Sequence, residues 1–578
     1  MILQALYDYY QRKAADPESG IAPEGWEWRG IPFLVVIDQS GNFIRFEDTR
    51  EGEGKQKRAK KFLVPTLGEK KGSGIKSNIL WETLEYVFGV STKQGQKSSR
   101  IKEQHLAFKE KIMKLTGDTK PLNALKAFVN KNHEEQITQD PIWDKVLELN
   151  RNLLLSFDGE GPFSDLKHIQ EAINATRKGT GIFGPCLVSG KDSELSRLEP
   201  SIRGIKGANP TGASLVAVNN EVVNGNNGGQ TPAFASFMKQ QGFNSPISAS
   251  ASFAYTTALN ILLEQDSLNK INIGDMTIVF WAQKKFEKFD LETELPWFFK
   301  SDKDDPDRNV NAVKSLYQAI EAGRLSFDKD DRFYVLGLAP NAARISVRFW
   351  KTGKVADFAG RIRKHFEDFN IVHGPNDHEY LSLYQILSST VLDYKMDNVP
   401  PNLASAVVVS ILDGTPYPRT LAQQCVRRIR AEQKVTRPRA AILKASINRF
   451  NRRYNNSAKE VLVALDRTNT DTGYRMGRLF AVLEKIQEES GTNASIRERF
   501  YGAASSTPIT VFSRLLKLNN YYLAKLAPGR KVQMEKEIQD IVDTLKAFPA
   551  HLTLDQQSMF AIGYYQQRQD FFKKKDVE

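Results

Sequence analysis

Positively charged side chains are concentrated between Arg419 and Arg453, where eleven lysines and arginines accompany one acidic residue, Glu432. Like charges at this density repel one another unless a polyanion or scattered acids neutralise them. One interpretation is a solvated basic face. The stretch lies between mixed α/β sequence and almost purely helical sequence, which favours a nucleic acid that runs between two halves of the chain. The candidates for contact with its backbone are Arg427, Arg428, Arg430, Lys434, Arg437, Arg439, Arg449, Arg452 and Arg453.

A second basic region lies near the N-terminus, where a cluster of lysines and one arginine precedes the glycine-rich loop 68–78. Glycine lacks a Cβ and so lets the backbone approach a phosphate or groove closely, while lysines release counterions when they contact phosphates. Asn78 stands where the loop is expected to become a helix, and its amide can donate to and accept from base edges. Asparagine is also a good helix N-cap, so both interpretations stay open. The candidates for duplex contact are Lys70, Lys71, Gly72, Gly74, Lys76 and Asn78, and those for backbone contact are Lys55, Lys57, Arg58, Lys60 and Lys61.

The segment 337–350 supplies a third set of candidates. Its alternating pattern predicts a strand with Arg344 and Arg348 on one face. The other face then holds apolar residues, namely Ile345, Val347 and Phe349. Two arginines on one strand face can grip a nucleic-acid backbone, or they can pair with acids of the fold. Together with Asn341 in the preceding loop, they are added to the candidates for backbone contact.

Residues suited to catalysis do not form a recognisable site. The run 179–184 matches G-x-G-x-x-G, but a helix is expected before it and a strand after it, the reverse of the dinucleotide-binding order. His373 and His378 are five residues apart and supply too few metal ligands. The acids Asp302, Asp304, Asp305 and Asp307 could hold a divalent cation, although the proline among them favours a solvated linker. We expect a binding protein that is not an enzyme and has no metal or cofactor.

The overall composition fits a nucleic-acid partner or an anionic membrane surface. The chain of 578 residues carries a formal charge of +13 and a pI near 9.3, and its length suggests about two to four domains. No apolar run reaches the roughly 18 residues of a membrane span, and no secretory signal is evident at the N-terminus. Two cysteines, Cys186 and Cys425, are too few for a disulfide framework. We therefore expect a cytoplasmic protein.

Hydrophobic periodicity indicates the elements that must position these residues. We expect helices at 2–12, after Asn78, through 98–173 and at 250–263, and strands at 31–38, 43–47, 276–282 and in segments near 185–190 and 214–219. Leu421, Cys425 and Ile429 predict one buried helix face. Pro438 separates that helix from a second, which is expected to be seated by Ile442, Ala445 and Phe450.

These elements predict an α+β, multidomain fold with a mixed α/β N-terminal part and a C-terminal helical bundle. The expected divisions are 1–418, with candidate subdivisions near 98–175 and 301–308, a basic helical connector at 419–454, and the bundle at 455–578.

Several segments, in this order, resemble the large subunit of the type I-C CRISPR effector complex, Cascade. They are KSNILWETLEYVFG, CLVSG with SGKDSELSRLEPSIRGIKG, SASFAYTTALNILL, LAPNAARISVRFW, RMGRLFAVLEKIQEES, ASSTPITVFSRLLKLNNYYLAKL and FPAHLTLDQQSMFAIGYYQQRQDFF. The likeness extends from the first to the last hundred residues.

The resemblance implies a non-catalytic subunit of an RNA-guided surveillance complex active in antiviral defence. Such a subunit recognises the protospacer-adjacent motif in duplex DNA, helps to unwind the target and form the R-loop, binds the displaced strand and recruits a helicase-nuclease. The implied partners are CRISPR RNA, double-stranded target DNA, the displaced single strand, the backbone, RNA-processing and small subunits of Cascade, and the helicase-nuclease. The family also makes its C-terminal helical portion separately from an internal start, for which Met476 or a position near Val461 or Val463 is available.

By this resemblance, the N-terminal domain reads the motif through the loop that ends at Asn78. A second loop, containing Asn227 and Gln230, would separate the strands. The basic helices would guide the displaced strand or the heteroduplex backbone. Two other functions remain open: a nuclease that uses the acids of 302–307 with a divalent cation, and a scaffold that binds RNA-loaded protein partners without reading DNA.

Overall fold

The chain folds into two compact units in the computed structural model. Unit 1 comprises Met1–Gly204, Ala208–Gln265 and Asn341–Ile345, and unit 2 comprises Ile205–Gly207, Asp266–Pro340 and Ser346–Glu578. The structure describes residues 1–52, 57–66, 74–91, 98–176, 181–218, 241–284, 291–299, 308–322, 332–492, 495–543, 545 and 547–572. Within these ranges, no helix combines the length and apolar character that crossing a membrane would need. The predicted boundaries at 418/419 and 454/455 stay predictions.

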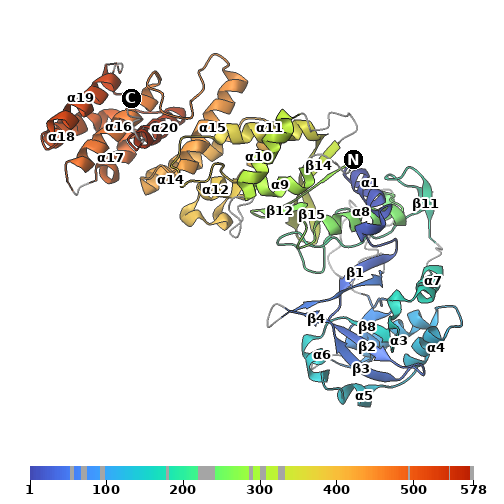
Figure 1. The fold of residues 1–578 in the computed structure, drawn as a ribbon. Helices are drawn as coiled ribbons and strands as arrows, with labels where there is room; N and C mark the ends of the chain where they lie inside the picture. The colour runs from blue at the N-terminus through green and yellow to red at the C-terminus, as the bar shows by residue number, and fades with distance from the viewer. Residues whose placement is uncertain are drawn as a thin grey trace, which may run out of the picture. The chain divides into compact units, whose positions relative to one another are not determined.

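The central sheet of unit 1 is built on β2 (Phe33–Ile37), all five residues of which are buried. Its path is β3-β2-β8-β7, in which β2 runs antiparallel to β3 (Phe43–Asp48) and parallel to β8 (Leu153–Phe157). The short strands β7 (Trp81–Glu82) and β9 (Gly161–Pro162) both pair with β8. Helices surround this sheet (Figure 1), namely α3 (Ser98–Met113), α4 (Lys120–Phe128), α5 (Glu134–Thr138) and α6 (Trp143–Leu149). The short helix α2 (Leu84–Val87) follows β7 in the chain.

The predicted hairpin of residues 31–47 is confirmed, but two neighbouring expectations were wrong. The stretch 98–173 is interrupted by β8, because a short buried run such as LLLSF has no periodicity that separates strand from helix. The helix expected directly after Asn78 is a short strand followed by four helical residues, and Thr83 rather than Asn78 occupies the N-cap position.

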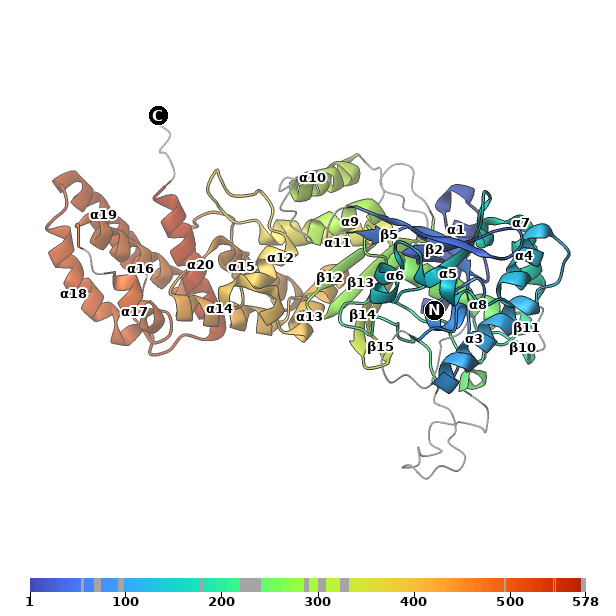
Figure 2. The ribbon, with the colours of Figure 1, turned by 90° about the horizontal axis from the view of Figure 1, so that it is seen from below.

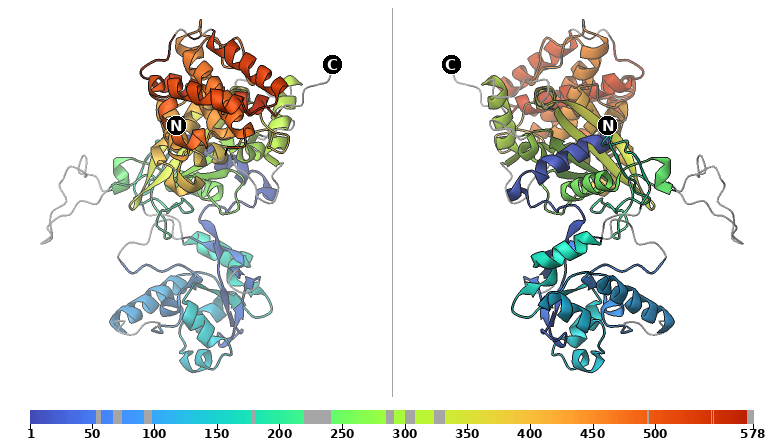
Figure 3. Two further views of the ribbon diagram at one scale, coloured as in Figure 1. Left: turned by 90° about the vertical axis from the view of Figure 1, so that its left-hand side faces the viewer. Right: turned by 90° about the vertical axis from the view of Figure 1, so that its right-hand side faces the viewer.

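The rest of unit 1 consists of a second strand ribbon and a helix pair. In the ribbon, β1 (Trp26–Gly30) runs antiparallel to β6 (Lys61–Pro65), and β4 (Arg50–Glu51) pairs with β5 (Arg58–Ala59). Helices α1 (Ile2–Ala14) and α8 (Ala249–Leu262) lie side by side (Figure 3), with the rings of Tyr10 and Phe253 5.7 Å apart. The remaining elements are η1 (Pro17–Ser19), η3 (Phe163–Asp165), α7 (Lys167–Ala175), β10 (Phe183–Pro185), β11 (Asp192–Glu194) and η6 (Gln241–Asn244).

Two strands expected in this region are absent from the described residues. Strand β10 ends at Pro185, and a turn that includes Gly190, with a positive φ of 70°, replaces the strand expected near 185–190. Ala213 and Ser214 make isolated bridges only. Helix α7 precedes the run 179–184 and strand β10 begins within it at Phe183, so the order is the reverse of the dinucleotide-binding order, as expected. Residues 177–180 lie outside the described residues.

Unit 2 begins with an antiparallel four-stranded sheet in the order β12-β13-β14-β15. Every residue of β13 (Met276–Ala282) is buried, as its apolar sequence predicts. Its partners are β12 (Lys270–Ile273) and β14 (Arg332–Asn341), and β15 (Arg344–Lys354) closes the sheet. The tip of the β14–β15 hairpin belongs to unit 1. Three helices pack with this sheet in one apolar core, namely α9 (Leu291–Phe299), α10 (Arg308–Glu321) and α11 (Val355–Phe369).

The remainder of unit 2 is helical (Figure 2), which confirms the predicted α+β class with a helical C-terminal part. Helices α16 (Thr472–Glu489) and α20 (Leu554–Asp570) approach closely because glycines face the opposing backbone. A Cβ on Gly477 would overlap the carbonyl oxygen of Phe560, and a Cβ on Gly563 would overlap that of Tyr474. The other elements are α12 (Leu383–Ser388), η7 (Leu392–Tyr394), η8 (Met396–Asn398), α13 (Pro401–Asp413), α14 (Arg419–Glu432), α15 (Arg437–Tyr454), α17 (Ile496–Ala504), η9 (Pro508–Thr510), α18 (Phe512–Leu523) and α19 (Pro528–Val542).

Candidate nucleic-acid interface

The basic stretch forms two helices, α14 and α15, with Pro438 in the first turn of the second. Leu421, Cys425 and Ile429 are buried, so the predicted apolar face of α14 is confirmed. In α15, Ile442 and Ala445 are buried, as expected. Phe450 was expected to seat this helix but is exposed, and the guanidinium of Arg419 lies 5.5 Å from its ring centroid.

Exposed cations follow one face of α14. Gln423, Arg427 and Arg430 are spaced i, i+4, i+7, and all three are exposed beside Val426 in a shallow groove. Neither arginine makes an ion pair with a described acid. Lys434, beyond the end of α14, and Arg453, in the last turn of α15, are also exposed. These four cations are free to contact a polyanion.

The other predicted arginines of the stretch contact the protein itself. Arg437, Arg439 and Arg449 are buried, with exposed fractions of 8%, 0% and 5%. The Nε of Arg439 donates to the carbonyl oxygen of Ser389 at 2.9 Å, and its guanidinium lies 2.6 Å from the carboxylate of Glu432. Arg437 donates to the carbonyl oxygens of two residues, His378 and Glu379.

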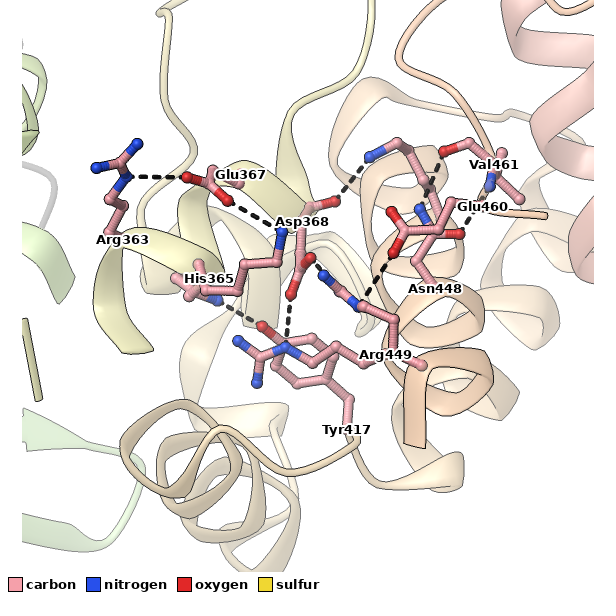
Figure 4. Close-up of polar contacts among 12 residues, drawn as sticks. Arg363, His365, Glu367, Asp368, Tyr417, Asn448, Arg449, Glu460 and Val461 are labelled. Atoms are coloured by element: carbon pink, nitrogen blue, oxygen red, sulfur yellow. Dashed lines mark hydrogen bonds and ion pairs between the residues drawn. The ribbon is translucent and has the colours of Figure 1, made fainter. Parts of the chain in front are cut away.

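Asp368 of α11 is the centre of a buried network that joins α11 to α15 (Figure 4). The Nε of Arg449 donates to Asp368 Oδ2 at 2.6 Å, and Arg449 Nη1 also donates to the carbonyl oxygen of Ser410 at 2.9 Å. Arg452 pairs with the other oxygen of Asp368. The Nζ of Lys444 donates to the backbone carbonyl of Asp368, and burial lowers the pKa of this lysine. These cations therefore hold helices together.

Arg428 occupies an intermediate position, half-buried and paired with Glu432. Burial raises the pKa of Glu432, but hydrogen bonds from Arg439 and Arg428 outweigh it and hold that pKa below its usual value. Direct contact with a nucleic acid needs an accessible guanidinium. We therefore leave the three buried arginines out of the proposed surface and place the two half-buried ones, Arg428 and Arg452, at its margin.

Asn78 lies in unit 1, is 5% exposed and is held by Glu82. Its backbone N–H and its Nδ2 both donate to Glu82 Oε1, each at 3.0 Å. The N-cap interpretation of Asn78 is wrong, because the next helix begins at Leu84 and Thr83 occupies its N-cap position. The side chain of Asn78 lines a cavity.

The other predicted contact residues from this part of the sequence differ in their exposure to solvent. Gly74 is exposed and Lys76 is partly buried. Lys57, Arg58, Lys60 and Lys61 are exposed on and beside β5 and β6, and the Nζ of Lys61 pairs with Glu264 at 2.8 Å. Several predicted residues lie outside the described residues: Lys55, Lys70, Lys71, Gly72, Asn227 and Gln230, together with Asp302, Asp304, Asp305 and Asp307.

The β14–β15 hairpin carries the third predicted set. Asn341 ends β14, and Arg344 opens β15, both exposed. The guanidinium of Arg348 lies 3.5 Å from the carboxylate of Asp275. Val347, expected on the buried face, is 40% exposed, because the inner face of this edge strand is covered only at some positions.

Sequence analysis missed a group of arginines that the fold of unit 1 brings to Asn78. Arg29, Arg151 and Arg203 line the same cavity, beside the ring of Trp81. These residues come from widely separated parts of the chain, and none lies in a charge run. No local sequence signal could therefore have identified them.

The comparison with known families defines the class of protein: the chain belongs to a family of CRISPR-associated proteins. The family is described as CRISPR-associated protein (Cas_Csd1), and its model matches residues 6–572. This match confirms the resemblance to the large subunit of the type I-C Cascade complex and makes the chain a Cascade subunit. No curated protein matches the chain.

Proposed function

We propose that this chain is the subunit of a type I-C CRISPR surveillance complex that recognises the protospacer-adjacent motif in duplex DNA. In this proposal it also helps to unwind the target and form the R-loop, binds the displaced strand and recruits the helicase-nuclease that degrades DNA. The observation that carries the proposal is the family match across nearly the whole chain. In RNA-guided complexes, base pairing reads the target and protein reads the short adjacent motif.

The placement of Asn78 supports a role in reading the motif. An amide can recognise base edges when its orientation is fixed, and the hydrogen bond from Asn78 Nδ2 to Glu82 fixes this one. The exposed cations on and beside β5 and β6, elsewhere in unit 1, would supply contacts to phosphates that do not depend on sequence.

The exposed face of α14 supports a second role, the guidance of a nucleic-acid backbone in unit 2. Arg427 and Arg430 lie on one face without an acidic partner among the described residues. Their contacts with phosphates would be independent of base sequence and sensitive to salt. We assign this surface to the displaced strand.

The proposal includes no catalytic activity for this chain and therefore differs from a nuclease. The part of the chain that the structure describes contains no group of acids, histidines and cysteines arranged to hold a metal ion. The acids of 302–307, which a nuclease could use, lie outside the described residues. Incubation of the purified chain with DNA and Mg²⁺ or Mn²⁺ tests the alternative directly, because cleavage would contradict the proposal.

Two sets of variants test the division of labour between the two surfaces. Asn78→Ala should weaken binding to a duplex with the correct motif by about 1 to 3 kcal/mol, because a base contact is lost, and should leave binding to a motif-free duplex unchanged. The double variant Arg427→Gln, Arg430→Gln should weaken the binding of both DNAs alike and flatten the salt dependence. Gel-shift titrations of the assembled complex measure both effects. Equal losses on both duplexes for Asn78→Ala would assign this residue to structure alone.

A further inference from the structure

Unit 1 contains a cavity of about 560 Å³ at the meeting point of several segments. Strand β1, the start of β7, the residues before β8, and the loop 200–211 with α8 each contribute side chains to it. The polar residues that line it are Glu27, Arg29, Thr66, Asn78, Arg151, Asn152, Ser201, Arg203, Thr211, Thr256, Thr257 and Asn260. The cavity is therefore a polar site assembled by tertiary structure.

The charge of the lining is positive. Three arginines, Arg29, Arg151 and Arg203, line the cavity with one acid, Glu27, and a second acid, Glu82, lies behind Asn78 and interacts with Arg29. Glu27 Oε2 lies 3.4 Å from Arg29 Nε and 3.3 Å from Arg203 Nη1, so one carboxylate serves two guanidinium groups. Arg151 is exposed at the edge of the cavity and has no ion pair with a described acid. The cavity has room and charge for an additional anion.

Arg29 is the most constrained of the three cations. Its guanidinium lies 5.2 Å from the ring centroid of Trp81, and the Nε1 of that indole donates to the carbonyl oxygen of Pro65 at 2.8 Å. The Nε of Arg29 is buried and makes no hydrogen bond with a described residue, because the ion pair to Glu27 lacks suitable geometry. Burial lowers the pKa of Arg29, yet arginine stays charged in proteins.

The loop that carries Arg203 is held firmly. Asn260 of α8 accepts the backbone N–H of Arg203 at 2.8 Å and donates to the carbonyl oxygen of Ser201 at 3.1 Å. Ile202 and Ala213 exchange two backbone hydrogen bonds of 2.9 Å. Gly212 has a φ of 103°, and a Cβ there would crowd Ser201. The site is thus formed before any ligand arrives, which lowers the entropy cost of binding.

We propose that this cavity binds one backbone phosphate of a nucleic acid, held by Arg29, Arg151 and Arg203. Guanidinium groups match the two free oxygens of a phosphodiester in a bidentate manner, and three of them outnumber the carboxylates of Glu27 and Glu82. The assignment of the phosphate to a nucleic acid, rather than to a small molecule, rests on the proposed function. Because Asn78 lines the same cavity, a phosphate here would bring the adjoining nucleotide to the amide that we propose as motif reader.

Three variants, made in the full chain and assembled into the complex, test the phosphate site. Arg151→Gln and the double variant Arg29→Gln, Arg203→Gln should each weaken the binding of a fluorescently labelled duplex about threefold to tenfold near 0.1 M salt, and each should lower the slope of log K against log salt concentration by about one. Glu27→Gln should instead tighten binding, because it removes the competing anion. Arg100→Gln is the matched control, since this exposed arginine of α3 does not line the cavity.

Opposite effects of the arginine and glutamate variants cannot arise from unfolding, which would weaken both. Unchanged affinity and unchanged salt slope in the arginine variants, or weaker binding in Glu27→Gln, would overturn the site. The fluorescence anisotropy titrations use duplexes with and without the motif and also a single-stranded guide-like RNA. Equal losses on both duplexes assign the phosphate to target DNA, whereas losses confined to RNA assign it to the guide.

The same titrations separate the phosphate site from the proposed function. If the wild-type complex failed to discriminate between the two duplexes, motif reading would fail. The cavity would still stand as a phosphate site if its arginine variants lowered the salt slope. Conversely, if the wild-type complex discriminated between the two duplexes but the arginine variants had no effect, the phosphate site would be contradicted and motif reading would stand.

Discussion

Arginines in the same basic stretch perform two different tasks, which depend on burial. Arg449 is enclosed between α11 and α15 and is paired with Asp368, whereas Arg453, one helical turn later, is exposed. A buried guanidinium paired with a carboxylate contributes to the fold because the loss of one partner leaves an uncompensated charge. Net charge along a sequence therefore does not define a binding surface.

Replacement of Arg449 tests this distinction. Arg449→Ala should lower the free energy of unfolding by about 3 to 5 kcal/mol, since Asp368 would lose one of its two pairing arginines and two backbone carbonyls would lose a donor. Arg453→Ala is the matched control and should leave stability almost unchanged. Chemical denaturation of the purified chain measures both. A stable Arg449→Ala protein that had lost its DNA affinity would contradict the structural role.

At the scale of elements, the close approach of α16 and α20 holds the C-terminal bundle together. Gly477 faces the backbone of α20, and no side chain can be added there without moving one helix away from the other. Each of these helices buries many apolar residues, so a shift of the pair would open the core.

This contact predicts contrasting effects of two glycine substitutions. Gly477→Ala should destabilise the protein by at least about 2 kcal/mol, because the new Cβ would overlap the backbone of Phe560. Gly502→Ala, in the interior of α17, has no atom near the added Cβ and should be neutral or stabilising by up to about 1 kcal/mol. Thermal unfolding compares the two variants. Equal changes in stability for the two variants would mean that the close approach of α16 and α20 does not depend on the absence of a side chain at Gly477.

The same helix pair bears on where a separately made C-terminal fragment would begin. A start at Met476 would remove Tyr474, whose hydroxyl donates to Gln566 Oε1 at 2.5 Å and accepts the backbone N–H of Asp466. We therefore expect the fragment to begin before Thr472, as a start near Val461 would allow. Intact-mass measurement of the purified complex determines the N-terminus. A fragment that begins at Met476, or no fragment at all, would contradict this expectation.

For the molecule as a whole, the sequence predicted the features that depend on local periodicity. The buried strand β13, the apolar face of α14 and the helical C-terminal part all follow from patterns within a few turns of chain. Strand β8 was missed because a short buried run carries no period of its own. The N-cap interpretation of Asn78 was wrong because a short strand follows it and the next helix begins only at Leu84, with Thr83 at its N-cap.

The candidate site depends mainly on contacts that local patterns do not contain. Arg29, Arg151 and Arg203 are separated by 122 and 52 positions in the sequence, and only the fold places them around one cavity. Similarly, no local pattern predicts that Arg439 is buried, because its partner is the backbone carbonyl of Ser389, which lies 50 residues earlier in the chain. The family resemblance identified the class of protein, which no single motif indicates, because it rests on many segments that occur in the same order along the chain.

The central claim is that the chain reads bases that flank the target, and one measurement tests it most directly. The assembled, guide-loaded complex is titrated with two fully matched duplex targets that differ only in the adjacent motif. The account predicts at least about tenfold tighter binding of the target with the correct motif, as expected for a loss of about 1 to 3 kcal/mol per mismatched base pair. Equal affinity for both targets, whatever bases flank them, would contradict it.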